Sequence, residues 1–213
     1  MPKTKRSIVY VDGFNFYYGL LRSPRLRRCK WLDFEKLFRR LRPHDDLRLI
    51  KYFTAYWRDG SGERHRVYTR ALTQSPFIQV IEGRYKRKTT RCRVASCQHS
   101  GSREYTTFEE KETDVNMGLH ILDDGYRDSL DILVLVSADS DLVPALAMFR
   151  ERFPLKQIVV YIPGPRSRYD NALELRTIAD SARVLPANII PHCLLPTEIK
   201  APSGQVIRKP ANW

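Results

Sequence analysis

The stretch that decides the fold is ILVLVSADSD, residues 132–141, in which five apolar residues precede two aspartates that lie one residue apart. An unbroken apolar run of this length is typical of a strand that is buried on both faces, as in a parallel sheet. In open parallel sheets, ligands bind beyond the carboxyl ends of the strands. Asp139 and Asp141 therefore fall where such a sheet would place functional side chains.

Predicted strands and helices alternate along the rest of the chain, which indicates an α/β fold with a central, mostly parallel sheet flanked by helices. We expect Asp33 and Thr113 to cap their helices. We also expect a single domain over residues 1–185 with a basic, cysteine-containing insertion at about 86–107, and a C-terminal strap at 186–213 that packs on the same domain. The predicted strands are 7–11, 47–57, 77–85, 132–136 and 157–162, and the predicted helices are 14–21, 31–38, 63–73, 113–124, 142–150 and 168–179.

The charge of the chain predicts a polyanionic partner. It holds 37 Lys and Arg against 24 Asp and Glu, a net charge of +13, and the basic residues cluster at 22–30, 38–42 and 83–93. Such clusters favour nucleic acid, RNA or DNA. There is no apolar run of about 18 residues and no signal-peptide pattern, so we expect a cytoplasmic protein without membrane association. The residues expected to contact nucleic acid are Arg22, Arg25, Arg27, Arg28, Lys30, Arg84, Lys86, Arg87 and Lys88.

Two further aspartates lie at predicted element ends: Asp12 follows the first strand, and Asp114 opens a helix in the sequence TDVN. Taken singly, each acid has an ordinary interpretation as a turn residue, a helix-end charge or a cap. Gathered with Asp139 and Asp141 in one cleft, however, they would repel one another, and a divalent cation would relieve that repulsion. Oxygen ligands favour Mg²⁺ or Mn²⁺ over Zn²⁺. We therefore predict a Mg²⁺ or Mn²⁺ site, with either one ion or two.

Six segments, in order along nearly the whole chain, resemble the NYN-domain family, the LabA-like branch of the PIN-like nucleases. The resemblance implies a PIN-like three-layer sandwich whose acidic cluster binds Mg²⁺ or Mn²⁺ and supports ribonuclease activity. We expect endonucleolytic cleavage, although the sequence does not decide between an endonuclease and an exonuclease. A DNA-directed nuclease and a non-catalytic module that binds nucleic acid remain alternatives. The segments are VDGFNFYYGLL (11–21), KWLDFEKL (30–37), KYFTA (51–55), EEKETDVNMGLHILDDGY (109–126), LVLVSADSDLVPAL (133–146) and RKPANW (208–213).

The resemblance also implies roles for individual residues. Asn15 would position a phosphate or a metal-bound water, and Ser137 would form a hydrogen bond with a ligating carboxylate. Some relatives carry an acid where this chain has His120, so His120 is a candidate substitute for that acid. The implied catalytic residues are Asp12, Asn15, Asp114, Asp139 and Asp141, of which the four aspartates are the implied metal ligands.

The segment RCRVASCQH, residues 91–99, places Cys92, Cys97 and His99 in a C-x4-C-x-H pattern. Structural zinc normally takes four ligands, and this segment supplies three. Two interpretations stay open: a reduced thiol pair in a basic loop, or a small structural zinc site that touches the backbone of the substrate.

Overall fold

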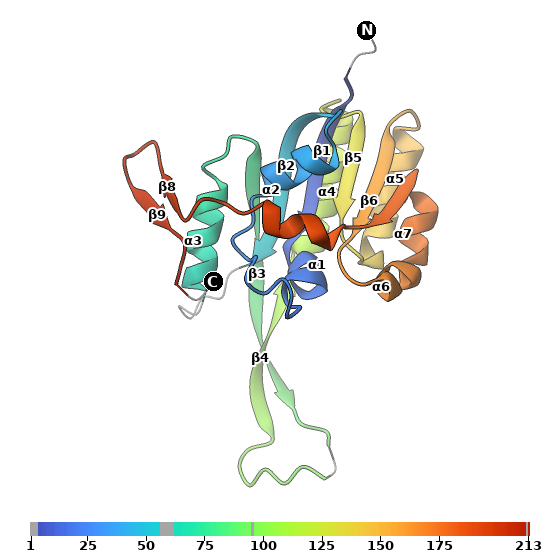
Figure 1. Cartoon of the computed structure of the whole chain (residues 1–213). Coiled ribbons are helices and arrows are strands. Elements are labelled where there is room, and N and C mark those ends of the chain that lie inside the picture. The colour runs from blue at the N-terminus through green and yellow to red at the C-terminus, as the bar shows by residue number, and fades with distance from the viewer. Residues whose placement is uncertain (1–3, 56–61, 95, 212) are drawn as a thin grey trace.

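The computed structural model describes residues 4–55, 62–94, 96–211 and 213. Its centre is a seven-stranded sheet in the order β4-β3-β2-β1-β5-β6-β7 (Figure 1). All neighbouring strands are parallel except β3 and β4, which confirms the predicted sheet type. The strands are β1 (Arg6–Asp12), β2 (Asp46–Ala55), β3 (Ile78–Arg91), β4 (Glu104–Lys111), β5 (Ile132–Val136), β6 (Gln157–Ile162) and β7 (Ser181–Val184).

Helices cover both faces of the sheet. Successive residues of a strand point to opposite sides, so each strand contributes to a core on either face. Val9 and Val11 of β1 belong to a core with α2 and α3, whereas Ile8 and Tyr10 belong to a second core with α4, α5 and α7. This is the predicted three-layer sandwich. The helices are α1 (Gly13–Phe16), the π-helix η1 (Tyr17–Leu21), α2 (Phe34–Leu41), α3 (Glu63–Leu72), α4 (Thr113–Tyr126), the 3₁₀ helix η2 (Ser140–Leu142), α5 (Val143–Arg152), α6 (Arg166–Asn171) and α7 (Leu173–Ile178).

Several local predictions can be compared with these bounds. Asp33 caps α2 as predicted, because its side chain accepts a hydrogen bond from the Lys36 amide at 2.9 Å. The prediction that Thr113 caps α4 is wrong: Glu112 is the residue before the helix and has a left-handed φ of 79°, while Thr113 is buried inside the first turn. The single helix predicted at 168–179 is two short helices, α6 and α7, interrupted at Ala172. Residues 56 and 57 of the predicted second strand lie outside the described residues.

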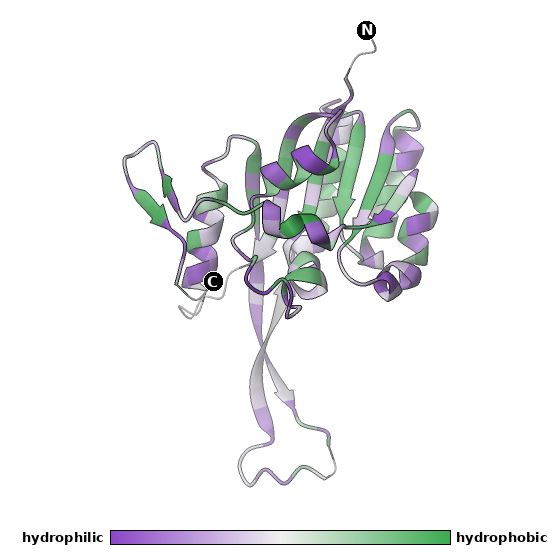
Figure 2. Ribbon diagram, viewed as in Figure 1, coloured by the Kyte–Doolittle hydropathy of each residue, from purple (hydrophilic) through white to green (hydrophobic). Residues whose placement is uncertain are grey.

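Strands β3 and β4 continue beyond the body of the molecule as a long two-stranded hairpin, paired from Arg84 with Lys111 to Arg91 with Glu104. Figure 1 shows the hairpin projecting away from the sheet, and Figure 2 shows that few of its residues are strongly hydrophobic. The basic insertion predicted at about 86–107 corresponds to the distal part of this hairpin.

The segment after residue 185 contains the 3₁₀ helix η3 (Ala187–His192) and a small antiparallel pair, β8 (Glu198–Lys200) and β9 (Val206–Arg208). Ile190 and Ile207 are buried in the core on the α2 and α3 side of the sheet. The Trp31 indole N–H donates a hydrogen bond to the Pro196 carbonyl at 2.7 Å. In the described part of the chain, every helix is too short or too polar to cross a bilayer.

Candidate metal centre and nucleic-acid interface

Three of the four predicted aspartates meet at the carboxyl end of the sheet. Asp12 ends β1, Asp139 follows β5, and Asp114 lies in the first turn of α4. Strands β1 and β5 are parallel neighbours, with Val11 opposite Val136, so their following residues emerge at one edge. One carboxylate oxygen from each aspartate lies within 4.8 Å of those of the other two. We call Asp12, Asp114 and Asp139 the aspartate cluster.

Local hydrogen bonds hold two members of the aspartate cluster in place. Asp12 Oδ1 accepts from the Asn15 amide at 2.9 Å and so caps α1. Asp12 Oδ2 accepts from Ser137 Oγ at 2.9 Å, and Ser137 Oγ in turn accepts from the Asp139 amide at 3.1 Å. Ser137 is completely buried. It therefore links the ends of β1 and β5, and it contacts a carboxylate as the resemblance implied.

The aspartate cluster carries negative charge with little compensation. Burial raises the pKa of Asp12 above its ordinary value. The pKa of Asp114 is raised to about 6, first by burial and then by the negative charges of Asp12, Asp139 and Asp141. No lysine or arginine within the described ranges forms a salt bridge with a member of the cluster. Closely spaced carboxylate oxygens without a positive partner are the donor set that suits a hard divalent cation.

The other residues implied for catalysis lie around the cluster in different ways. Asp141 is exposed, and its amide donates to Asp139 Oδ1 at 3.1 Å, so its carboxylate lies outside the group of three. Asn15 Oδ1 accepts from the Ala138 amide at 3.2 Å and from the Arg168 guanidinium. The Asn15 side chain thus fastens the loop that carries Asp139.

His120 is half-buried and lies in a separate group of polar side chains. Its Nδ1 is 3.2 Å from Lys51 Nζ, and Lys51 forms a 2.5 Å salt bridge with Asp124. The structure therefore places His120 beside a lysine, and the three carboxylate oxygens that come together all belong to the aspartate cluster.

The residues predicted to contact nucleic acid form two groups. The first lies in the loop after η1, where Arg22 lies over the Tyr18 ring and Lys30 over the Tyr17 ring. The second lies on the hairpin, where Arg84 pairs with Glu112 at 3.4 Å. The exposed members are Arg22, Arg25, Arg27, Arg28, Arg84, Lys86, Arg87 and Lys88, and Lys30 is half-buried.

Cys92, Cys97 and His99 lie beyond the paired part of the hairpin. Both cysteines are free and half-buried, and His99 is exposed. Among the residues that the structure describes, the three side chains do not gather as a group of metal ligands in the way that the aspartates do. Zinc binding at this tip stays a prediction.

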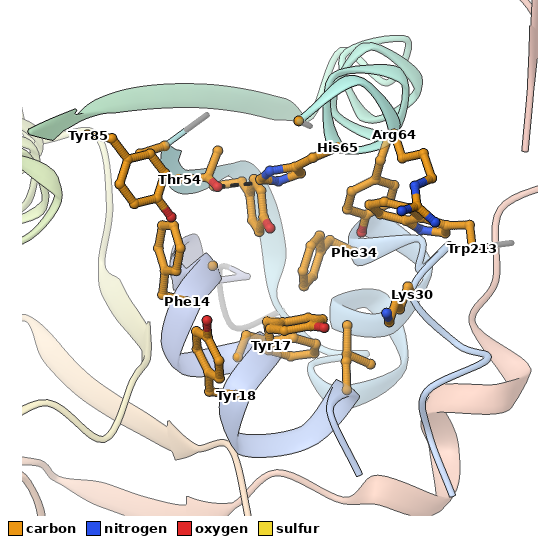
Figure 3. Close-up of a pocket in the computed structure, with 17 residues that line it drawn as sticks. Phe14, Tyr17, Tyr18, Lys30, Phe34, Thr54, Arg64, His65, Tyr85 and Trp213 are labelled. Atoms are coloured by element: carbon orange, nitrogen blue, oxygen red, sulfur yellow. Dashed lines mark hydrogen bonds between the residues drawn. The ribbon is translucent and has the colours of Figure 1, made fainter. Parts of the chain in front are cut away.

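Sequence reasoning missed a cavity of about 270 Å³ that is lined by aromatic residues (Figure 3). One of its lining residues, Gly13, directly follows Asp12. The residues that line the cavity come from α1, η1, α2, β2, α3 and β3. In the sequence they are scattered aromatic residues and form no motif. Its lining includes Phe14, Phe16, Tyr17, Tyr18, Lys30, Phe34, Tyr52, Thr54, Arg64, His65, Tyr68, Tyr85 and Trp213.

The three-layer arrangement and the aspartates at the strand ends define a PIN-like α/β protein with a candidate metal site. The model of the NYN domain matches residues 6–182, and the chain therefore belongs to the NYN domain family. Membership in this family and the partly buried cluster fit a metal-dependent nuclease that acts on nucleic acid.

Two known proteins are similar over most of the chain. The 6-hydroxy-3-succinoylpyridine 3-monooxygenase HspA of Pseudomonas putida is 29% identical over 240 aligned residues, which cover 98% of this chain and 75% of that protein. A crystal structure of a Vibrio parahaemolyticus protein of unknown function matches with a TM-score of 0.56 at 17% identity, covering 92% of this chain and 99% of that one. The second likeness concerns the fold alone.

Proposed function

We propose that this protein is a metal-dependent endoribonuclease that hydrolyses RNA phosphodiesters at the aspartate cluster. The observation that carries the proposal is the meeting of three carboxylates within 4.8 Å, without a described cationic partner, in a chain with a net charge of +13. A cluster of negative charge repels RNA by itself, so the arrangement suits catalysis only when a cation neutralises the cluster and the surrounding basic residues hold the strand.

Asp12, Asp114 and Asp139 would hold Mg²⁺ or Mn²⁺, which supplies charge neutralisation at the phosphate and activates water for attack. Asp141, which is exposed and whose amide donates to Asp139, would orient the attacking water. Ser137 keeps Asp12 and the Asp139 backbone in register. The basic residues of the loop after η1 and of the hairpin would bind the phosphates on either side of the cleaved bond.

The decisive experiment uses a circular single-stranded RNA, because a circle has no ends and is opened by an endonuclease alone. We expect opening by the wild-type protein with Mg²⁺ or Mn²⁺, none with EDTA, and none by the Asp139→Asn variant. A matched control is Asp123→Asn, which changes an exposed acid of α4 that pairs with Arg127. Equal activity of the Asp139→Asn variant would assign the cleavage to a contaminant or to another site.

Linear RNA and DNA of one sequence, tested side by side, separate the ribonuclease from a DNA-directed nuclease, since only RNA offers a 2′-hydroxyl. Tight, salt-dependent binding of RNA without any turnover, in several metals, would instead favour a non-catalytic binding module.

A second candidate function is action on a small aromatic molecule. The name of the Pseudomonas putida relative specifies the monooxygenation of a substituted pyridine. The specific observation that favours this candidate here is the aromatic-lined cavity next to Asp12. Incubation with 6-hydroxy-3-succinoylpyridine, air and a reductant, followed by mass spectrometry, tests it: an oxygenated product that requires the protein would support it.

A further inference from the structure

The aromatic cavity and the aspartate cluster are connected by short segments of the chain. Gly13 lines the cavity and is bonded to Asp12, so their Cα atoms are about 3.8 Å apart. On the other side, Gly83 packs so tightly on Thr113 that a Cβ at Gly83 would lie 2.5 Å from the threonine Oγ1. Thr113 precedes Asp114, and Tyr85 lines the cavity two residues after Gly83. Two members of the cluster are thus tied to the wall of the cavity through short segments.

The walls of the cavity suit a flat ring. Phe34 and Tyr52 lie with ring centroids 5.1 Å apart, and Phe14 meets Tyr85 edge to face at 5.9 Å. Figure 3 shows Tyr85, Phe14 and Tyr18 along one side of the cavity and Phe34 across from them. Aromatic rings prefer offset-stacked or edge-to-face neighbours, and a cavity of about 150 Å³ is already enough to bind benzene. The 270 Å³ here leaves room for a larger heterocycle.

The cavity also offers polar groups and positive charge. Thr54 Oγ1 lies 3.3 Å from His65 Nε2 inside it, and burial lowers the pKa of His65 to about 4, so the imidazole is neutral at pH 7. Lys30 contributes a cationic side chain to the lining. Apolar walls with a few polar groups select a ring with a polar edge, and the lysine favours one that carries an anion. A nucleotide has all three features.

We propose that this cavity binds one unpaired nucleobase of the substrate strand, next to the phosphodiester that lies at the aspartate cluster. The inference rests on the proposed ribonuclease function and makes it more specific. It predicts a preference for single-stranded RNA, because a paired base is not available to enter the cavity. Tyr17 and Tyr18, which meet edge to face at 5.2 Å, form the part of the wall nearest to the basic loop.

The test measures binding in EDTA, where the metal-dependent reaction cannot proceed. The probe is 2-aminopurine riboside 5′-monophosphate, whose fluorescence is quenched when its base stacks on an aromatic ring. We expect saturable quenching by the wild-type protein, and binding about tenfold weaker in the Tyr18→Ala variant, as is common for the loss of one stacking ring. Tyr18 is 58% exposed, so its removal should not disturb folding.

The matched control is Tyr126→Ala. Tyr126 is 66% exposed and also forms one edge-to-face pair, with Phe153, but it lies far along α4 from the cavity. Unchanged binding in this variant together with weaker binding in Tyr18→Ala would support the proposal. No quenching at millimolar probe, or equal binding by the wild-type and Tyr18→Ala proteins, would overturn it.

Displacement of the probe by adenosine monophosphate supports a base site. If free substituted pyridines bind and nucleotides do not, the cavity serves a small molecule and the proposal fails.

The same measurement separates this inference from the proposed function. Cleavage of circular RNA without nucleotide binding in the cavity would leave the ribonuclease standing and remove the base site. Nucleotide binding that depends on Tyr18, without cleavage in any metal, would keep the base site and remove the ribonuclease.

Discussion

Two buried aspartates in this molecule have opposite surroundings. Asp124 is 6% exposed and lies against Lys51 Nζ at 2.5 Å and the Tyr10 hydroxyl at 2.6 Å. Asp12 is 3% exposed, and it receives hydrogen bonds from Ser137 and the Asn15 amide but lies among two further carboxylates. Both groups are extensively buried, yet the charge of Asp124 is neutralised within the protein and that of Asp12 is not.

Asp124 has the surroundings of a structural acid, and Asp12 has those expected of a metal ligand. Removing a charge from water is expensive, and a fold that buries one usually supplies the opposite charge. At Asp124 the chain supplies it from β2. At the aspartate cluster the described chain supplies hydrogen-bond donors to Asp12 and no salt bridge, as expected if a metal ion supplies the positive charge.

The largest effect is expected from breaking the structural pair. The Lys51→Met change leaves Asp124 buried without its cation, and such changes lower the free energy of unfolding by about 3–5 kcal/mol. Urea denaturation measures this. The double variant Lys51→Met, Asp124→Leu should recover most of the loss, because a neutral pair needs no desolvation of charge. A single variant as stable as the wild type would show that Asp124 simply takes up a proton.

The reverse result is expected for Asp12→Asn. In EDTA this variant should be at least as stable as the wild-type protein, because it removes repulsion within the cluster. Its rate of RNA cleavage with Mg²⁺ or Mn²⁺ should fall by at least about a hundredfold, or about 2.7 kcal/mol. The free energy of unfolding and the rate of cleavage, both measured on one preparation of the variant, test this combination of unchanged stability and lost activity. A variant that lost stability and activity together would place Asp12 with Asp124, as a structural acid.

The aspartate cluster could be predicted from the sequence because each of its parts is local. A buried strand followed by an aspartate is visible at Asp12 and again at Asp139, and parallel neighbours place their carboxyl ends at one edge. The pairing of Lys51 with Asp124 joins residues 73 positions apart, and a lysine in a strand has no pattern that marks it as buried.

Three other features could not be predicted from the sequence either. The aromatic cavity is lined by a few residues from each of several elements that are far apart in the chain, so no single motif indicates it. The interruption at Ala172 depends on backbone geometry, with a ψ of 47° at a residue that ordinarily favours helix. The loop roles of Asn15 and Arg168 depend on the contact between α1 and α6, which follows from the sheet order and not from either segment.

Metal binding should stabilise the folded protein through the aspartate cluster and not through Asp124. At a concentration one hundred times its Kd, Mn²⁺ should stabilise the folded protein by about 2.7 kcal/mol, visible as a higher Tm. The Asp12→Asn variant should lose most of this shift, whereas the Asp123→Asn control should keep it. The absence of any shift in the wild-type protein would contradict the site.

The pH dependence has a definite sign. The pKa of Asp114 rises from 3.8 to about 6 in the folded protein, so without metal the folded state holds this proton more tightly than the unfolded state. Ionisation of Asp114 therefore lowers stability as the pH rises from about 4 to about 6. Mn²⁺ requires the ionised form, so its stabilising shift should grow over the same range. Thermal melts at several pH values, with and without Mn²⁺, measure both trends, and Asp114→Asn should flatten them.

A smaller effect is expected from a residue that supports the aspartate cluster without belonging to it. Arg168 contacts Asn15 Oδ1, which also accepts the Ala138 amide beside Asp139. Arg168→Ala should lower kcat for RNA cleavage by about tenfold with little change in KM, because the loop loses its anchor and the site loses its geometry. Arg168→Lys should recover part of the rate. The control is Arg166→Ala, which removes an exposed arginine of the same helix that pairs with Asp170. A change confined to KM would assign Arg168 to substrate binding.

The smallest effect is expected on the hairpin, where the charges are exposed and replaceable. Lys86 is exposed on β3, and its replacement by Ala should weaken binding of single-stranded RNA by about two- to threefold. If Lys86 touches a phosphate, the slope of log K against log salt should also become shallower by about 0.7. Arg183→Ala, at an exposed position of the edge strand β7 on the other side of the sheet, is the control and should change neither quantity. Equal losses from Lys86→Ala and Arg183→Ala would mean that net charge alone attracts the RNA, and that the hairpin is no more a binding surface than the opposite edge.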